Sequence, residues 1–135
     1  LSRGLGDVYK RQELYRHGAR NILIMPIDLP LVQTDDLLEI AALGERHSFI
    51  ICPDQDLAGT NAIFLANRLS IHFRFGKESC QRHQTEARRC GVIPFVHFNE
   101  RVARDVDSPE DLSILGDGAS DPGRDRVTVS HAQSP

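Results

Sequence analysis

Short apolar runs separated by amphipathic stretches recur along this chain, and this order predicts alternating strands and helices. The run at residues 21–27, NILIMPI, is almost continuously apolar, as expected of a strand buried on both faces. The run at residues 71–75, IHFRF, instead alternates apolar and polar positions, which predicts a strand with one wet face or an edge strand. Further strands are predicted at residues 48–52, 62–66 and 92–98.

Helix signals lie between these runs. Residues 13–17 followed by Gly18 read as the last turns of a helix with a glycine C-cap. Thr34 is the predicted N-cap of the next helix, which ends at Gly44. Asp35 and Asp36 then fall in its first turn, where the helix dipole favours anions, and a dipole role is the preferred interpretation over a ligand role.

A further helix is predicted from about residue 78 to residue 90, ended by Gly91. His83 lies on the border of its apolar stripe. We interpret His83 as a partly buried structural histidine in preference to a catalytic one. Ser108 and Pro109 have the N-cap and first-position pattern of another helix start.

The order of elements predicts a three-layer α/β domain with a mostly parallel sheet, and an inserted antiparallel hairpin remains open. Residues 1–12 lack periodicity and are predicted to be non-native or disordered. Residues 116–135, rich in Gly, Asp, Ser and Pro, are predicted to be a disordered tail. Residues 13–115 then form a partial domain. Because the first residue is not Met, we expect that an N-terminal portion is missing.

Composition narrows the functional class. The chain has 135 residues, of which 40% are hydrophobic and 26% charged, as expected of one soluble domain. A net charge of −3 argues against nucleic acid or an anionic membrane as partner, and no apolar run reaches the roughly 18 residues of a membrane span. The cysteines are odd in number and lack CxxC spacing, which predicts free thiols and a cytoplasmic location: Cys52, Cys80 and Cys90.

Three acids are candidate metal ligands. Asp28 follows the strand at residues 21–27, and ligands of open α/β sheets bind beyond the carboxyl ends of strands. Asp105 and Asp107 point to the same side of an extended chain, where two carboxylates need a cation or solvent to stay charged. Together they suit Mg²⁺. The alternatives are that Asp28 caps its turn and that Asp107 belongs to the following helix cap.

A turn at residues 76–79 is a candidate anion site, because it opens a helix. Its backbone N–H groups and the Ser79 hydroxyl are suited to receive a phosphate or carboxylate, with Arg74 and Lys77 adding positive charge. Thr60 is expected at the same edge of the sheet. Metal-binding acids beside an anion site indicate phosphoryl or nucleotidyl transfer.

Four motifs in order carry a family resemblance: IDLPL from Ile27, AGTNAIFL from Ala58, FRFGKESCQRHQTEARRCG from Phe73 and DVDSPEDL from Asp105. From about Arg20 to Leu115 the chain resembles the guanylyltransferases that make the phospho-carboxylate donor of the deazaflavin coenzyme. The resemblance implies a Rossmann-like nucleotidyltransferase fold. It also implies transfer of GMP from GTP to phosphoenolpyruvate, 2-phospho-L-lactate or 3-phospho-D-glycerate, with release of pyrophosphate.

Residue roles follow from the resemblance at matching positions. Asp28, Asp105 and Asp107 look like the Mg²⁺ ligands. The positions that resemble the acceptor site are Thr60, Gly76 and Ser79, with Asn61 nearby in a less defined role.

The chain also departs from the family pattern. Cys80 stands where a Phe is usual, and the family's N-terminal nucleotide-binding strand and basic loop have no counterpart before Glu13. We therefore expect the chain by itself to be inactive or very weak. The alternatives are a nucleotidyltransferase of the molybdopterin or sugar-phosphate type, and a non-catalytic remnant that binds a phospho-carboxylate.

Overall fold

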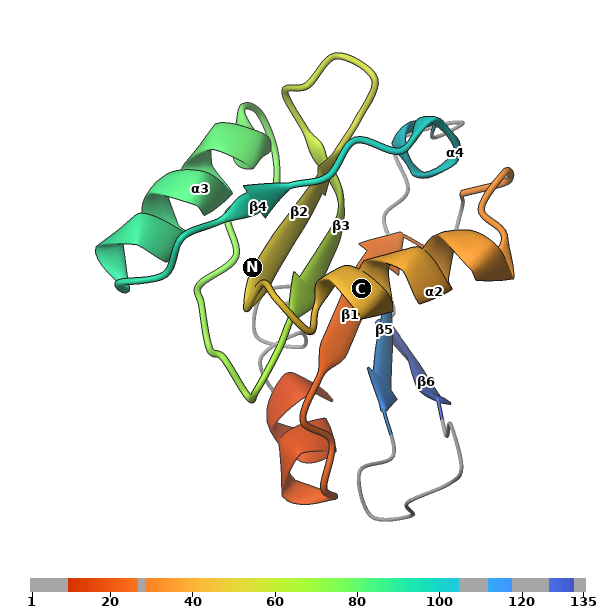
Figure 1. Cartoon of the computed structure of the whole chain (residues 1–135), viewed down its shortest axis with the longest axis vertical. Coiled ribbons are helices and arrows are strands. Elements are labelled where there is room, and N and C mark those ends of the chain that lie inside the picture. Colours follow the sequence, from red (N-terminus) through yellow and green to blue (C-terminus); the bar gives the residue numbers. More distant parts are fainter. Residues whose placement is uncertain (1–9, 27–28, 105–111, 118–126, 133–135) are drawn as a thin grey trace.

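The computed structural model describes residues 10–26, 29–104, 112–117 and 127–132, and for the last two ranges only the course of the backbone. Figure 1 shows helices packed around one sheet. The elements are helical residues 10–16, β1 (Ile22–Pro26), α2 (Thr34–Leu43), β2 (Phe49–Pro53), β3 (Thr60–Leu65), α3 (Ser79–Arg89), β4 (Phe95–Val96), α4 (Glu100–Ala103), β5 (Leu112–Asp117) and β6 (Val127–Ala132).

The strands β1, β2 and β3 are buried on both faces, as their apolar runs predicted. Successive side chains enter two separate cores because they alternate across the sheet. One core joins Ile22, Ile51 and Ile63 to α3 and to Leu14 of the helical residues 10–16. The other joins Leu23, Ile50 and Phe64 to α2 and α4. The prediction of an α/β fold with helices on both faces of the sheet is confirmed.

The prediction of a mostly parallel sheet is wrong. The sheet has the order β4-β2-β3-β1-β5-β6, and of its described pairs only β2 with β4 is parallel. Because β3 follows β2 through a hairpin, it returns antiparallel and lies between β2 and β1. The strands β1, β2 and β4 therefore share one direction, as helix crossovers require, but β3 separates β1 from β2.

The hairpin loop between β2 and β3 is held by the carboxylate of Asp54. Its Oδ1 atom accepts the N–H groups of Asp56 and Ala58, each at 3.1 Å. The Asp54 N–H donates to the Gly59 carbonyl across the loop. This carboxylate fixes where β3 begins, at Thr60.

Residues 71–75 do not form the predicted strand. Side chains satisfy this backbone in place of a neighbouring strand. The Arg11 guanidinium donates to the Ile71 carbonyl at 2.8 Å, and Nε2 of His83 accepts the Arg74 N–H at 2.8 Å. Just upstream, the Tyr15 hydroxyl donates to the Leu69 carbonyl at 2.7 Å.

Both end segments contain residues with regular structure. Residues 10–12 are helical, and Arg11 is buried with its guanidinium 4.8 Å from the centre of the Phe73 ring. Within the predicted tail, residues 116–117 belong to β5 and residues 127–132 form β6. β5 pairs with the edge of β1, whose N–H and C=O groups need partners. The domain boundaries themselves stay a prediction.

The remaining expectations concern a strand, a helix start, the cysteines and membrane spans. The predicted strand at residues 92–98 is reduced to Phe95–Val96, which pairs with β2. The helix start at Ser108 lies outside the described residues. All three cysteines are free thiols, as predicted. Within the described part of the chain, no helix is long and apolar enough to cross a membrane.

Candidate functional site

The two predicted hydroxyl ligands meet in the structure. Thr60 is the first residue of β3 and Ser79 the first of α3, and the Ser79 hydroxyl donates to Thr60 Oγ1 at 2.9 Å. Both are nearly buried, with exposed fractions of 8% for Thr60 and 1% for Ser79. The sequence predicted that these residues lie at one edge of the sheet, and in the structure they are in direct contact.

His83 completes this cluster. It lies one turn into α3, fully buried, with its Nδ1 atom 3.0 Å from Thr60 Oγ1. The rings of Phe73 and Phe75 pack edge-on against the imidazole. Burial, together with a smaller effect of the nearby charge of Arg74, lowers the pKa of His83 to about 4. His83 is therefore neutral near pH 7, which agrees with the predicted structural histidine. It is fully buried, whereas the sequence predicted a partly buried side chain.

Gly76 and Glu78 shape the turn that leads into α3. Gly76 has φ of +115°, a conformation that L side chains rarely adopt, and a Cβ atom placed there would meet nothing within 4 Å. Glu78, just before the helix, is left-handed with φ of 57°. The first helical turn is not wholly available to a ligand, because the Cys80 N–H donates to the Ala58 carbonyl at 2.9 Å.

Asn61 connects β3 to α4. Its side-chain nitrogen donates to the carbonyls of Val102 and Ala103, both at 3.0 Å. The amide carries two N–H groups, so each carbonyl can receive one. Asn61 is buried and in this arrangement secures the backbone immediately before Arg104.

The predicted metal ligands Asp28, Asp105 and Asp107 lie outside the described residues. Among the residues that are described, no group of three or more His, Cys, Asp or Glu side chains is arranged to hold a metal. Residues near these three predicted ligands in the chain do come together. Pro26 pairs with Leu112 in the sheet. Leu31 and Arg104 line one surface hollow of about 350 Å³, together with Gln55, Phe98, Glu100 and Arg101.

Another hollow, of about 450 Å³, lies beside α3. It is lined by Arg74, Glu78, Gln81, Arg82, Thr85 and Glu86. Among the described residues it includes Arg74 of the predicted anion site, but neither Thr60 nor Ser79. We therefore do not assign it to the same site.

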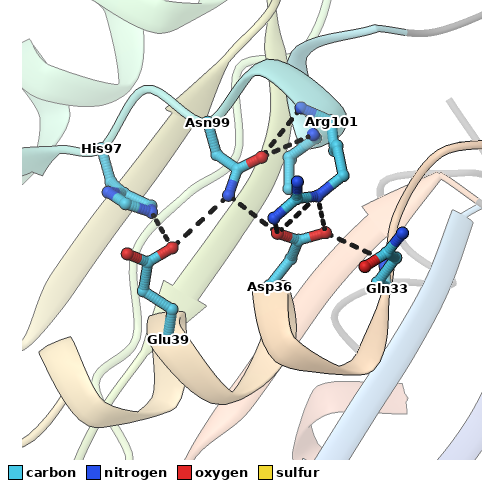
Figure 2. A network of polar contacts seen from close by, with 7 residues as sticks. Gln33, Asp36, Glu39, His97, Asn99 and Arg101 are labelled. Atoms are coloured by element: carbon cyan, nitrogen blue, oxygen red, sulfur yellow. Dashed lines mark hydrogen bonds and ion pairs between the residues drawn. The ribbon is translucent and has the colours of Figure 1, made fainter.

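An ion pair between a buried carboxylate and a half-exposed guanidinium joins α2 to α4, as Figure 2 shows. The carboxylate of Asp36 is fully buried and accepts from Arg101 through Nε and Nη2 at distances of 2.6–3.0 Å. It also accepts the Gln33 N–H at 2.8 Å, so the N-cap residue is Gln33 and not the predicted Thr34. The hydrogen bonds from Arg101 hold the pKa of Asp36 well below its usual range, against the opposing effect of burial. Asp36 thus lies in the first turn of α2, and its negative charge also binds a second helix, α4.

Asn99 links the same network to the start of α4. Its Oδ1 atom accepts the N–H groups of Arg101 and Val102, which caps the helix, while its Nδ2 atom donates to Asp36 at 3.0 Å. Glu39 lies within 3.5 Å of both Asn99 and His97 (Figure 2). The network therefore fixes α4, and with it the described chain up to Arg104.

The contacts of Arg101 and Asn99 were not predicted from the sequence. Asn99 directly before Glu100 is an N-cap signal that could have been recognised. No local signal connects Arg101 with Asp36, because the two residues are 65 positions apart.

The buried neutral His83 predicts a pH dependence of folding stability. In the unfolded chain a histidine titrates near pH 6.5, whereas folding lowers the pKa of His83 to about 4. The unfolded state therefore binds the proton first as the pH falls. The free energy of unfolding should be largest above about pH 6.5 and decrease towards pH 4. Urea denaturation at several pH values measures this, and a His83→Gln variant should show a shallower decrease. An equal slope in both proteins would contradict the assignment.

Comparison with known proteins places this chain in a family. A family model described as "Guanylyl transferase CofC like" matches residues 3–122. A phosphoenolpyruvate guanylyltransferase of Rubrobacter xylanophilus is 41% identical over 108 residues, covering 78% of this chain and 52% of that protein. A 2-phospho-L-lactate guanylyltransferase of Methanocaldococcus infernus is 32% identical over 102 residues, covering 73% of this chain and 47% of that protein.

The chain thus spans about half the length of these curated relatives. The family match nevertheless includes all four sequence motifs and the Thr60–Ser79–His83 cluster. This chain belongs to the family of CofC-like guanylyl transferases.

Proposed function

We propose that this protein transfers GMP from GTP to a small phospho-carboxylate, with release of pyrophosphate, in deazaflavin coenzyme biosynthesis. The observation that carries the proposal is the contact between Thr60 and Ser79, which brings two of the four motifs together. Relatives named for phosphoenolpyruvate and for 2-phospho-L-lactate support an acceptor that combines a phosphate with a carboxylate.

The proposed acceptor site consists of Thr60, Gly76 and Ser79. Hydroxyl and backbone N–H donors suit an acceptor with several anionic oxygens. The left-handed Gly76 leaves room above the backbone, as a close approach by a ligand requires. The Ser79 hydroxyl donates to Thr60, and Thr60 also contacts His83, so both hydroxyls are held in place before an acceptor arrives.

The proposed metal is Mg²⁺, held by Asp28, Asp105 and Asp107. Three carboxylates are a suitable donor set for this ion, and their described neighbours support convergence: Leu31 and Arg104 line one hollow. When bound, the ion neutralises charge on phosphate oxygens. Arg104 adds a further positive charge at that hollow.

The chemistry needs no nucleophile from the protein. A phosphate oxygen of the acceptor forms the new bond to the α-phosphorus of GTP, and the bond to the departing pyrophosphate breaks. The chain contributes by holding the acceptor and by limiting its movement, so orientation and charge neutralisation supply the rate. Asn61 has a supporting role, because its hydrogen bonds connect β3 to the backbone that leads to Asp105.

The proposal is tested by pyrophosphate release. We would assay the 135-residue chain and a chimera in which it replaces the aligned segment of the Rubrobacter xylanophilus protein. With Mg²⁺ and GTP, the chimera should release pyrophosphate only when phosphoenolpyruvate, 2-phospho-L-lactate or 3-phospho-D-glycerate is present. The chain alone should be stabilised by its acceptor in a thermal shift assay.

Other outcomes would contradict the proposal. Release with CTP but not GTP, or with a sugar phosphate or molybdopterin as acceptor, would indicate a different nucleotidyltransferase. Stabilisation by phosphoenolpyruvate with a folded but inactive chimera would indicate a binding protein without transferase activity.

A further inference from the structure

His83 joins the parts of the chain that present the proposed acceptor site. Its own helix, α3, begins with Ser79. Its Nδ1 atom contacts Thr60 at the start of β3, and its Nε2 atom contacts the backbone of Arg74, two residues before Gly76. Both ring nitrogens are therefore engaged with segments that carry site residues.

The direction of these hydrogen bonds follows from their chemistry. A backbone amide can only donate, so the Arg74 N–H makes His83 Nε2 an acceptor without a hydrogen. In the neutral imidazole the hydrogen must then be on Nδ1, where it faces Thr60 Oγ1 at 3.0 Å. The Ser79 hydroxyl donates to the same oxygen. Thr60 Oγ1 thus accepts twice, and its own hydrogen is left to donate in another direction.

We propose that His83 is a positioning residue for the acceptor site. It directs the Thr60 hydroxyl hydrogen towards an anionic oxygen of the acceptor and holds the backbone between Arg74 and Gly76 in place. This inference rests on the function proposed above. His83 does not touch the reacting atoms and acts through Thr60 and the turn.

The surroundings of His83 indicate that its ring nitrogens contribute more than the packing of the ring alone. The imidazole is buried beside the rings of Phe73 and Phe75, where an apolar side chain would pack at no desolvation cost. Its hydrogen bonds to Thr60 and to the Arg74 backbone offset that cost, and both partners belong to segments of the proposed site.

Two conservative variants separate the two contacts. In His83→Asn the side-chain amide lies near the Nδ1 position and can still donate to Thr60, but it cannot reach the Arg74 N–H. In His83→Gln the amide reaches the Nε2 position and can still accept from Arg74, but the Thr60 contact is lost. Ile40→Val, in the core on the opposite face of the sheet, is the control for general loss of stability.

The probe is phosphoenolpyruvate, titrated into the 135-residue chain. His83→Gln should bind it about tenfold more weakly than the wild type, because Thr60 loses the donor that orients it. His83→Asn should stay within about threefold in affinity, while its Arg74 amide should exchange with solvent faster. Ile40→Val should leave the affinity unchanged. A purely structural histidine would instead make both His83 variants lose stability and leave affinity unchanged, as in the control.

A ligand-free measurement accompanies the titration. Nitrogen NMR of the His83 ring should show the hydrogen on Nδ1, and a hydrogen on Nε2 would overturn the inference. Unchanged affinity of His83→Gln beside a wild type that binds would overturn this inference alone. A folded wild-type chain that binds none of the three phospho-carboxylates would overturn the proposed function, and this inference with it.

Discussion

Replacement of Asp28 by asparagine should reduce pyrophosphate release by the active chimera by on the order of a thousandfold. The substitution keeps the size of the side chain and removes one negative charge from the proposed Mg²⁺ site. The phosphate charge that develops during transfer would then lack much of its neutralisation. Steady-state rates at saturating Mg²⁺, GTP and phosphoenolpyruvate measure the effect, and Asp105→Asn and Asp107→Asn should behave alike.

Asp35→Asn is the matched control for these variants. Asp35 is an exposed acid in the first turn of α2 that is not among the proposed ligands, and its substitution removes the same charge. Its rate should equal that of the wild type. If Asp28→Asn retained activity within about tenfold of the wild type, the metal assignment would be wrong.

Replacement of Arg101 by methionine should lower the melting temperature of the chain by roughly 5–10 °C. The carboxylate of Asp36 is fully buried, so removal of its cationic partner leaves a buried charge without its main counter-charge. The N–H of Gln33 and the amide of Asn99 still bind the carboxylate, which limits the loss. Thermal unfolding followed by circular dichroism measures the change.

Arg16→Met provides the comparison, because Arg16 also pairs with an acid, Glu13, but both side chains are more than half exposed. Exposed pairs contribute little, so this variant should melt within about 2 °C of the wild type. Adding Asp36→Leu to Arg101→Met should recover part of the lost stability, since the uncompensated charge is then removed. A double variant less stable than Arg101→Met alone would contradict this explanation.

The position of α4 connects this stability prediction to the proposed activity. Asp36, Asn99 and Asn61 hold α4 from two sides, and the chain leads from α4 directly to Asp105. A loosened α4 should therefore affect the acids of the proposed metal site more than the Thr60–Ser79 contact.

Local signals determined much of what the sequence predicted correctly. Continuous apolar runs identified β1 and β2 because both faces of these strands are buried. The ordered motifs identified the family, which the family match from residue 3 to residue 122 confirms. Each of these signals involves residues close together in the chain.

Only the tertiary structure decided which distant groups meet. The insertion of β3 between β1 and β2 made the sheet mostly antiparallel, although the strands joined by helices still run in one direction. Residues 71–75 have the alternation of a strand, yet their backbone groups bind Arg11 and His83 instead. Arg101 reaches Asp36 across 65 positions. Apolar periodicity reports which residues are buried, whereas partners that satisfy buried polar groups are chosen only when the whole chain packs.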